Sequence, residues 1–362
     1  MTAASASTGP FKIIVQPSGR TFTVETGEAI LPAAIRQGIG MPYGCKDGAC
    51  GSCKCRKLEG TVVHGVHQAK ALSAQEEADG YILTCCGVPQ SDVVIESKQV
   101  TDESAFPIRK MPSRVLSMEK RSHDVVVLRM QLPANDTMRY HAGQYVEFIL
   151  RDGARRSYSM ANAPHTLMQN TGGTTSGPVI ELHIRHMAGG KFTDHVFTAM
   201  KEKEILRVEG PYGSFYLRED SDKPMVLLAS GTGFAPIKAV IEHIQFKGSQ
   251  RPVTLYWGGR RPADLYLDDW VQAKLAEMPN LKYVPVISDA LPEDNWTGRT
   301  GFVHRAVIED FPDLSGHQVY ACGAPIVVDS ARKQYSDDCK LPPDEFYADS
   351  FTTEADKHGK TA

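Results

Sequence analysis

The sequence predicts a multi-domain protein in which an α+β unit is followed by an antiparallel β-barrel and then by an α/β domain with a parallel sheet. Three observations support this order. Strands and one amphipathic helix come first, short alternating strands between Gly and Pro turns follow, and buried strands then alternate with helices. The 362 residues, 41% of them hydrophobic, are enough for two or three domains that each bury a core.

The changes of pattern place the domain boundaries. Residues 98–111 carry mixed charge, one Pro and little periodicity, so we interpret them as a linker that lets neighbouring domains reorient. The expected divisions, in chain order, are a disordered tail at 1–10, an α+β domain at 11–97, the linker, a barrel at 112–219, an α/β domain at 220–355 and a tail at 356–362.

Hydrophobic periodicity predicts the elements of each domain. In the first domain, strands at 11–15 and 21–24 flank a Pro-Ser-Gly turn, and an amphipathic helix at 29–37 ends at Gly38. The expected elements of the barrel are strands at 125–130, 145–150 and 179–184 and a helix near 192–200. Those of the α/β domain are strands at 225–229, 253–257, 283–287 and 319–321 and helices at 237–246 and 270–278.

Charge and hydropathy exclude two classes of partner. The chain has 40 Lys and Arg against 43 Asp and Glu, without the basic excess that phosphate binding needs, so we expect no nucleic acid partner. No stretch approaches the roughly 18 apolar residues of a membrane span. Residues 1–10 lack the basic and apolar segments of a signal peptide, so we expect a cytoplasmic location without membrane binding.

The cysteines are crowded into one part of the chain. Six of the eight lie between Cys45 and Cys86, which in a reducing compartment indicates metal ligation rather than a disulfide framework. Cys45, Cys50 and Cys53 have the C-x4-C-x2-C spacing of plant-type [2Fe-2S] proteins, and Cys85 is expected to supply the fourth thiolate. Glycines in the loop let the backbone approach the cluster and offer N–H groups to sulfur.

Alternatives remain for the metal and for one ligand. Zinc prefers paired short Cys motifs or mixed Cys and His sets, which this loop with one remote cysteine fits poorly. Cys86 adjoins Cys85 and competes for the fourth position, although we interpret both Cys86 and Cys55 as packed or surface thiols.

Four cations surround the cysteine loop, and they suggest docking to an acidic partner surface. These residues are Lys46, Lys54, Arg56 and Lys57. A solvated face with scattered charge is the alternative, since residues 11–97 contain about as many acidic as basic side chains.

A short strand and a later helix start together indicate a flavin site. The strand presents a cation, an aromatic ring and hydroxyl groups, which suit the pyrophosphate, the ring face and the N5 edge of a flavin. Its residues are Arg156, Ser157, Tyr158 and Ser159.

The later segment, where a helix begins, offers bare N–H groups and a helix dipole for a pyrophosphate. Its candidate residues are His183, Ile184, Arg185, Gly189, Gly190, Lys191 and Thr193. Tyr158 or His183 alone would more often be a packing residue, and the combination favours FAD.

A glycine-rich turn indicates a nicotinamide site. Gly231, Thr232 and Gly233 follow a buried strand, and Pro236 is expected at the first position of the next helix, where no N–H is needed. The turn departs from G-x-G-x-x-G, and Arg260 rather than an acidic residue follows the next strand. The sequence therefore predicts a nicotinamide module that is not of the ordinary Rossmann type.

A second turn closes a later strand of the same domain. Cys322 and Gly323 would place a thiol at the carboxyl edge of the sheet, where open α/β sheets bind ligands. A buried, inert cysteine is the alternative interpretation.

These motifs, in this order and over nearly the whole chain, resemble the ferredoxin-NAD(P)H reductase superfamily. The chain looks most like three-domain reductases with an N-terminal ferredoxin that serve bacterial oxygenases, such as benzoate and terephthalate dioxygenase reductases. The stretches 255–260, 298–304 and 346–351 are also similar to CDP-deoxyglucoseen reductases. The resemblance implies a β-grasp ferredoxin domain, an FAD-binding barrel and a nicotinamide-binding α/β domain.

The resemblance also implies a reaction. Hydride from NADH would reach FAD, and single electrons would leave through the [2Fe-2S] cluster to a terminal oxygenase of Rieske, diiron or P450 type. NADPH is the alternative donor, because Arg260 and Arg261 can pair with a 2'-phosphate. The residues implied to take part in the reaction are Tyr158, Ser159, Cys322 and Phe351, the last as a cover for the flavin with Phe346 and Tyr347 as competing candidates.

Two other functions stay open at this point. A dideoxysugar reductase would share the same electron path. A non-catalytic redox sensor or electron carrier would keep the cofactors without rapid reduction by NADH, but the intact turns at 231–236 and 322–325 count against it.

Overall fold

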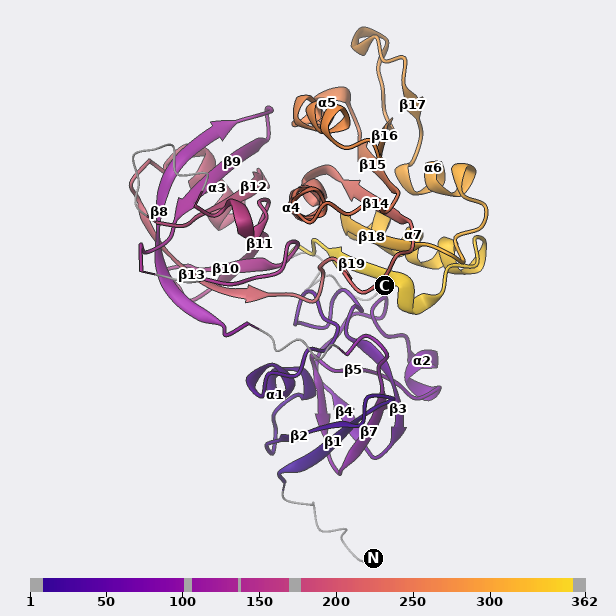
Figure 1. The fold of residues 1–362 in the computed structure, drawn as a ribbon. Coiled ribbons are helices and arrows are strands. Elements are labelled where there is room, and N and C mark those ends of the chain that lie inside the picture. Colours follow the sequence, from indigo (N-terminus) through magenta and orange to yellow (C-terminus); the bar gives the residue numbers. More distant parts are fainter. Residues whose placement is uncertain (1–8, 101–105, 136–137, 169–176, 354–362) are drawn as a thin grey trace, which may run out of the picture. The chain divides into compact units, whose positions relative to one another are not determined.

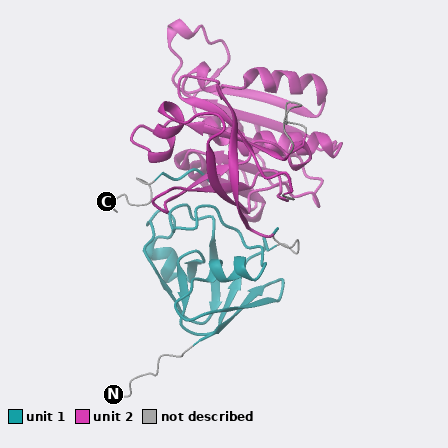
Figure 2. Cartoon of the chain, turned by 90° about the vertical axis from the view of Figure 1, so that its left-hand side faces the viewer, with its two compact units in different colours: residues 1–106, 350–362 teal, residues 107–349 magenta. Residues whose placement is uncertain are grey.

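The computed structural model describes residues 9–100, 106–135, 138–168 and 177–353. The chain divides into two compact units, residues 1–106 with 350–362 and residues 107–349 (Figure 2). Most of both predicted tails, and residues 101–105 of the predicted linker, lie outside the described residues. In the described part of the chain, no helix is long and apolar enough to span a membrane.

The first unit is a mixed five-stranded sheet with a helix, as in a β-grasp domain. Its elements are β1 (Phe11–Gln16), β2 (Arg20–Val24), α1 (Ile30–Arg36), β3 (Lys54–Glu59), β4 (Val62–His64), α2 (Ala74–Ala78), β5 (Tyr81–Leu83), β6 (Gly87–Pro89) and β7 (Val93–Glu96). The strand order is β2-β1-β7-β3-β5, with β1 parallel to β7, and β4 pairs separately with β6. Alternation along β1 buries Phe11, Ile13 and Val15 in the core, which confirms the predicted strand.

The second unit begins with a six-stranded antiparallel barrel. Its elements are β8 (Arg109–Lys120), β9 (Val125–Gln131), β10 (Tyr145–Ile149), β11 (Arg155–Ser159), β12 (Val179–Arg185), α3 (Lys191–Thr198) and β13 (Ile205–Tyr212). The order is β11-β10-β13-β8-β9-β12, and an isolated bridge between Met160 and Leu182 joins the two edge strands. Closing the sheet in this way removes its exposed edges and brings the ends of β11 and β12 together.

The rest of the second unit is a parallel sheet that helices cover (Figure 1). The elements are β14 (Met225–Ser230), α4 (Phe234–Phe246), β15 (Val253–Gly259), α5 (Asp268–Glu277), β16 (Leu281–Ile287), β17 (Arg299–Thr300), α6 (Val303–Asp310), β18 (Gln318–Gly323), α7 (Pro325–Asp337) and β19 (Phe346–Ser350). The strand order is β17-β16-β15-β14-β18-β19, and β14 pairs in parallel with both β15 and β18. The predicted three-domain fold class is therefore confirmed.

Two of the differences from the expected elements concern a domain boundary and the nicotinamide turn. β8 begins at Arg109, inside the stretch expected to be a linker, because Arg109–Met111 pair with Val208–Gly210 of β13. Helix α4 begins at Phe234, so Pro236 is its third residue rather than its first. The proline is still tolerated there, since the first N–H groups of a helix have no intrahelical partner.

Candidate cofactor and redox sites

The predicted cluster ligands lie on an irregular loop between α1 and β3. The loop turns tightly, with positive φ angles of 65° at Lys46, 75° at Gly48 and 74° at Gly51. A Cβ at Gly48 would lie 2.9 Å from the Cβ of His67, so only glycine fits between the loop and this neighbour. The sequence therefore forms a close-fitting loop here instead of a helix or a strand.

The four predicted ligands are arranged as two pairs of thiols. The backbone N–H of Cys45 donates to the sulfur of Cys50 at 3.4 Å. A hydrogen bond between their thiols raises the pKa of Cys45 and lowers that of Cys50 to about 6. The pKa of Cys85 is raised because its thiol hydrogen-bonds first with Cys53 and then with the neighbouring Cys86. The chain thus brings Cys45 to Cys50, and Cys53 to Cys85.

Two thiol pairs suit two metal ions better than one. In a [2Fe-2S] cluster the four thiolates divide between two irons, whereas structural zinc needs four ligands around one ion. Among the described residues, no three His, Cys, Asp or Glu side chains converge on a single ion. The residues present therefore fit the cluster, and the paired arrangement speaks against the zinc alternative.

The neighbouring thiols and cations have other contacts. Cys55 is buried on β3, and burial raises its pKa. Cys86 is half-buried next to Cys85, with its sulfur 4.0 Å from the carbonyl oxygen of Leu83.

Two of the four cations near the cluster are bound within their own domain. Lys54 pairs with Glu76 at 2.6 Å, and the ammonium of Lys57 donates to the carbonyl of Gly60 at 2.9 Å. The ion pair of Lys54 reduces the charge available for the predicted docking surface, whereas the hydrogen bond of Lys57 to a neutral carbonyl leaves its charge in place.

The flavin strand β11 meets the start of helix α3. The ring of Tyr158 packs against Phe148, with centroids 5.9 Å apart, and against Phe192, at 5.3 Å. Phe192 is the second residue of α3, whose first N–H groups have no intrahelical partner. The two segments that the sequence selects for FAD are therefore adjacent in space, as a shared dinucleotide site requires.

The side chains of β11 divide between two faces. Arg156 shares the face of Tyr158, and one guanidinium nitrogen donates to the carbonyl of Arg155 at 2.7 Å. Ser157 points to the other face, where its hydroxyl lies 3.5 Å from a carboxylate oxygen of Glu147. Arg156 and Tyr158 can therefore contact the same ligand, and the side chain of Ser157 is directed away from them.

The glycines before α3 shape its entry. Gly189 has a φ of 80°, and a Cβ at Gly190 would lie 2.6 Å from the hydroxyl of Thr193. That hydroxyl donates to the carbonyl of Met187 at 2.9 Å, so Thr193 holds the turn in place. Lys191 reaches outward to Asp152 at 2.6 Å.

His183 and Ile184 are buried in β12. The imidazole of His183 is hydrogen-bonded at both nitrogens, to the hydroxyl of Tyr266 at 2.8 Å and to Glu181 at 3.2 Å. Ile184 is fully buried in the barrel core. Any contact of these two residues with a flavin must therefore come from their backbone.

Ser159 meets a carboxylate that the sequence reasoning missed. Its hydroxyl lies 3.3 Å from an oxygen of Asp349, which is buried on β19 and is 190 positions away in the sequence. The charge of Asp349 also contributes to raising the pKa of Cys322, although burial of the thiol is the larger cause. A serine, a carboxylate and a thiol thus gather at one place. In the sequence, only its position two residues before Phe351, the predicted flavin cover, could have pointed to Asp349 as a site residue.

The nicotinamide turn is locked against the end of β18. A Cβ at Gly233 would lie 2.1 Å from the carbonyl oxygen of Cys322, and one at Gly323 would lie 2.4 Å from the carbonyl oxygen of Ser230. Gly323 also has a φ of 130°. The two predicted nicotinamide motifs therefore interlock through backbone contacts that exclude side chains.

A Gly233→Ala variant should test this interlock. The added methyl group would meet backbone rather than a flexible side chain, so the turn and the end of β18 must separate. We expect a loss of about 3 kcal/mol in the free energy of unfolding, at the upper end for overpacking. Chemical denaturation would measure it, with Gly316→Ala as the control because a Cβ there meets nothing within 4 Å. Equal stability of the two variants would contradict the interpretation.

Arg185 reaches from the barrel to the nicotinamide turn. Its guanidinium would lie 2.7 Å from a Cβ placed on Gly231, and it faces Asp124 at 3.1 Å and Asp264 at 3.7 Å. Two of its nitrogens are buried and make no hydrogen bond of good geometry among the described residues. Both of these nitrogens face a carboxylate, so Arg185 is held by ion pairs and brings a cation from the end of β12 to the nicotinamide turn.

The aromatic candidates near the C-terminus differ in their surroundings. Phe346 is buried in the core of the α/β domain, near Tyr335. Tyr347 stacks on Tyr320 with centroids 4.9 Å apart. Both rings are used for packing, so Phe351, which directly follows β19, stays the predicted flavin cover.

Comparisons with known proteins agree with this architecture. Residues 13–90 match a 2Fe-2S iron-sulfur cluster binding domain, residues 112–216 an oxidoreductase FAD-binding domain and residues 227–333 an oxidoreductase NAD-binding domain. A CDP-6-deoxy-L-threo-D-glycero-4-hexulose-3-dehydrase reductase from Yersinia pestis is 39% identical over 93% of this chain and 97% of that protein. Reductase component 2 of the terephthalate 1,2-dioxygenase from a Comamonas species is 34% identical over 94% of this chain and 97% of that protein.

A solved structure extends the likeness to the whole fold. The cytochrome P450 reductase GcoB of Amycolatopsis has a TM-score of 0.75 and 32% identity, covering 95% of this chain and 99% of that one. The chain therefore belongs to the ferredoxin-NAD(P)H reductase superfamily and is an oxidoreductase that uses NADH, FAD and a [2Fe-2S] cluster.

Proposed function

We propose that this chain is the reductase component of a two-protein system and supplies electrons from NADH to a terminal oxygenase. The observation that carries this proposal is the presence, in one chain, of a thiol-paired cluster loop and of a flavin strand whose Ser159 hydrogen-bonds to Asp349, the carboxylate that acts on Cys322. FAD accepts a hydride when it is bound, and the cluster passes electrons on one at a time. The chain supplies the binding, orientation and electrostatics for these steps.

The proposed roles follow from the contacts. Cys45, Cys50, Cys53 and Cys85 would hold the cluster. Arg156, Tyr158 and the first turn of α3 would hold FAD, with Gly189, Gly190 and Thr193 shaping that turn. Gly231, Thr232, Gly233 and Gly323 would approach the nicotinamide nucleotide closely, with Arg185 beside its phosphates.

Ser159, Asp349 and Cys322 would surround the reacting atoms. The hydroxyl of Ser159 has one proton, which it donates to Asp349 in this structure and would donate instead to the N5 edge of a bound flavin, with Asp349 holding the side chain at that place beforehand. The pKa of Cys322 is raised by burial, so its thiol stays protonated and acts by packing rather than as a nucleophile.

The two arginines at the end of β15 differ in their availability to the 2'-phosphate that distinguishes NADPH from NADH. Arg261 makes a bidentate pair with Asp294 at 2.7 and 2.8 Å and is thereby neutralised. Only the backbone of Arg260 is hydrogen-bonded within the described chain, to Asp264 at 2.8 Å and to Asp289 at 2.9 Å. Arg260 is therefore the one of the two arginines that is available to a 2'-phosphate.

Substitution of the two arginines should separate their roles. We expect Arg260→Ala to lower kcat/KM for NADPH by about tenfold, the value of one charge-assisted hydrogen bond, while kcat/KM for NADH is unchanged. Arg261→Ala should change neither, because its partner is Asp294. Steady-state reduction of ferricyanide with each nucleotide would measure this. An equal effect of the two substitutions on NADPH would contradict it.

A second function is favoured by one observation. The dehydrase reductase from Yersinia pestis is 39% identical to this chain, compared with 34% for the dioxygenase reductase component. The second candidate is therefore electron supply to a sugar-nucleotide dehydrase in dideoxysugar synthesis, which would use the same path through the chain.

Coupled turnover would decide between the two acceptors. Anaerobic stopped-flow with NADH should first show loss of flavin absorbance and then reduction of the cluster. The reduced protein would then be mixed with a Rieske oxygenase, a P450 and a CDP-6-deoxy-hexulose 3-dehydrase. Turnover with an oxygenase supports the first proposal, and turnover with the dehydrase alone supports the second. A flavin that stays oxidised with NADH would overturn both.

A further inference from the structure

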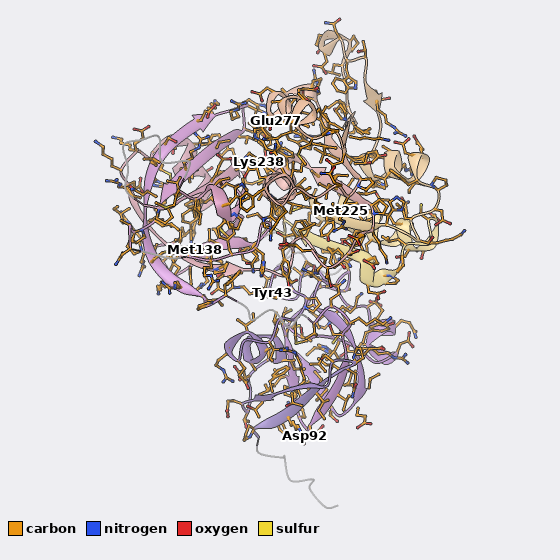
Figure 3. The ribbon with its side chains drawn as sticks, viewed as in Figure 1. Tyr43, Asp92, Met138, Met225, Lys238 and Glu277 are labelled. Atoms are coloured by element: carbon orange, nitrogen blue, oxygen red, sulfur yellow. The ribbon has the colours of Figure 1, made fainter. Side chains whose placement is uncertain are left out.

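The second unit contains a buried network of charged side chains that the proposed reaction does not use. It lies where strand β12 meets helix α4, and Figure 3 labels Lys238 on that helix. The ammonium of Lys238 contacts Glu242 at 2.6 Å, Glu181 at 3.2 Å and the carbonyl of Ala161 at 3.2 Å. All three donors of this buried lysine are therefore satisfied.

Glu181 is the centre of the network. Besides Lys238, it pairs with Arg129 at 3.1 Å and accepts from the imidazole of His183 at 3.2 Å. These contacts lower its pKa although burial opposes the shift, so Glu181 is ionised at neutral pH. With Glu242 the network contains two carboxylates and two cations, and its charges cancel.

His183 extends the network towards the nicotinamide turn. Because Glu181 can only accept, the nitrogen of His183 that faces it carries the proton, and the other nitrogen accepts from the hydroxyl of Tyr266 at 2.8 Å. The ring of Tyr266 contacts Trp257 edge to face at 5.3 Å. The indole N–H of Trp257 donates to the carbonyl of Gly231 at 3.0 Å.

The network ends at both motifs that must meet for hydride transfer. On one side, Ala161 and Ala163 follow the flavin strand β11 directly, and the N–H of Ala163 donates to Glu242 at 2.8 Å. On the other side, Lys238 lies five positions after Gly233, on the helix that the nicotinamide turn opens. A buried ion network is rarely a net gain in stability, but it fixes geometry because each partner is costly to leave unpaired.

We propose that Lys238, Glu181 and His183 are positioning residues that hold the flavin strands β11 and β12 in register with the nicotinamide turn. This inference rests on the proposed function, in which nicotinamide and flavin meet at these motifs. The network acts through the backbone of Ala161 and Gly231, and its side chains do not touch the reacting atoms. It therefore governs the rate of hydride transfer more than the affinity for either cofactor.

The test is a double variant, Lys238→Met/Glu242→Gln, which removes the link and keeps the remaining Arg129–Glu181 pair neutral. Stopped-flow with the holoenzyme and NADH would give the limiting rate of flavin reduction and the Kd for NADH. We expect the limiting rate to fall by about 10- to 100-fold, as a misplacement of about 1 Å does, with an unchanged Kd and full FAD content. The deuterium isotope effect with NADH labelled at C4 should persist, because hydride transfer limits the rate.

The matched control is Lys274→Met. Lys274 lies above the same ring as Lys238, that of Trp270, at 5.6 and 5.1 Å respectively, but it pairs with Glu277 outside the network. This variant should reduce flavin at the wild-type rate. A double variant with the wild-type limiting rate would overturn the proposal. Parallel losses of rate, FAD content and melting temperature would also overturn it, because they indicate only a structural role.

If the double variant does not fold, Tyr266→Phe tests whether the network positions the flavin strands against the nicotinamide turn. It removes one hydroxyl, keeps the ring contacts with Trp257 and leaves the charges intact. A slower limiting rate with an unchanged Kd supports the proposal, and an unchanged rate overturns it. Failure of the proposed function is distinguishable, because the wild-type flavin would then not be reduced by NADH at all.

Discussion

A Cys85→Ser variant is expected to lose the [2Fe-2S] cluster while it keeps FAD. The substitution breaks the Cys53–Cys85 thiol pair and replaces a thiolate by a hydroxyl, which is a poor ligand for iron. NADH-dependent reduction of cytochrome c through the cluster should fall by more than about 100-fold, since even outer contacts of a metal site cost about 10- to 100-fold. Reduction of ferricyanide by the flavin should persist. Visible absorbance and the EPR signal of the dithionite-reduced protein would report the cluster.

The neighbouring thiols provide the controls for this experiment. Cys86→Ser removes the half-buried thiol next to Cys85, and Cys55→Ser removes the buried thiol on β3. Both variants should retain the cluster signal. If Cys86→Ser lost the cluster and Cys85→Ser kept it, the fourth ligand would be Cys86, and the proposed pairing with Cys53 would be wrong.

A Ser159→Ala variant is expected to slow reduction of the flavin by NADH by about 100-fold, the usual effect of removing one positioned donor at a reacting centre. Flavin binding should change little, because the contacts proposed for FAD lie mainly on Arg156, Tyr158 and α3. The physical reason is the place of the hydroxyl, which is buried, held by Asp349 and close to Cys322. Stopped-flow flavin reduction and the FAD content of the purified protein would measure the two effects separately.

Two further variants make this prediction specific. Asp349→Asn keeps the size of the side chain but removes the charge that orients Ser159, so we expect a smaller loss of rate with normal FAD content. Ser315→Ala is the control, because the hydroxyl of Ser315 bonds to Asp313 and, among the described residues, to no part of the flavin or nicotinamide motifs. Equal losses of flavin binding and flavin reduction in Ser159→Ala would refute the assigned role.

Local patterns allowed much of the architecture to be predicted from the sequence. The alternation of Phe11, Ile13 and Val15 predicts β1, and the helix after Gly233 follows from its apolar periodicity. Element ends were less well predicted, because they depend on partners distant in sequence. β8 starts at Arg109 because β13 extends opposite it, and no local signal records that extension.

By itself, the sequence determined the cofactors and the order of the domains. The reason is that three of the four cluster ligands lie within about ten residues of one another, as does the whole Gly231–Gly233 turn, so spacing alone describes them. The relatives and the fold agree with that order.

Only the tertiary structure decided which side chains meet between these motifs. Asp349 reaches Ser159 across 190 positions, and Lys238 joins Glu181 from another domain. Neither contact leaves a periodic or short-range pattern, because strand order and helix packing bring the partners together. The buried polar and charged groups of such a contact are stable only when every partner is in place, and a linear pattern does not encode that requirement.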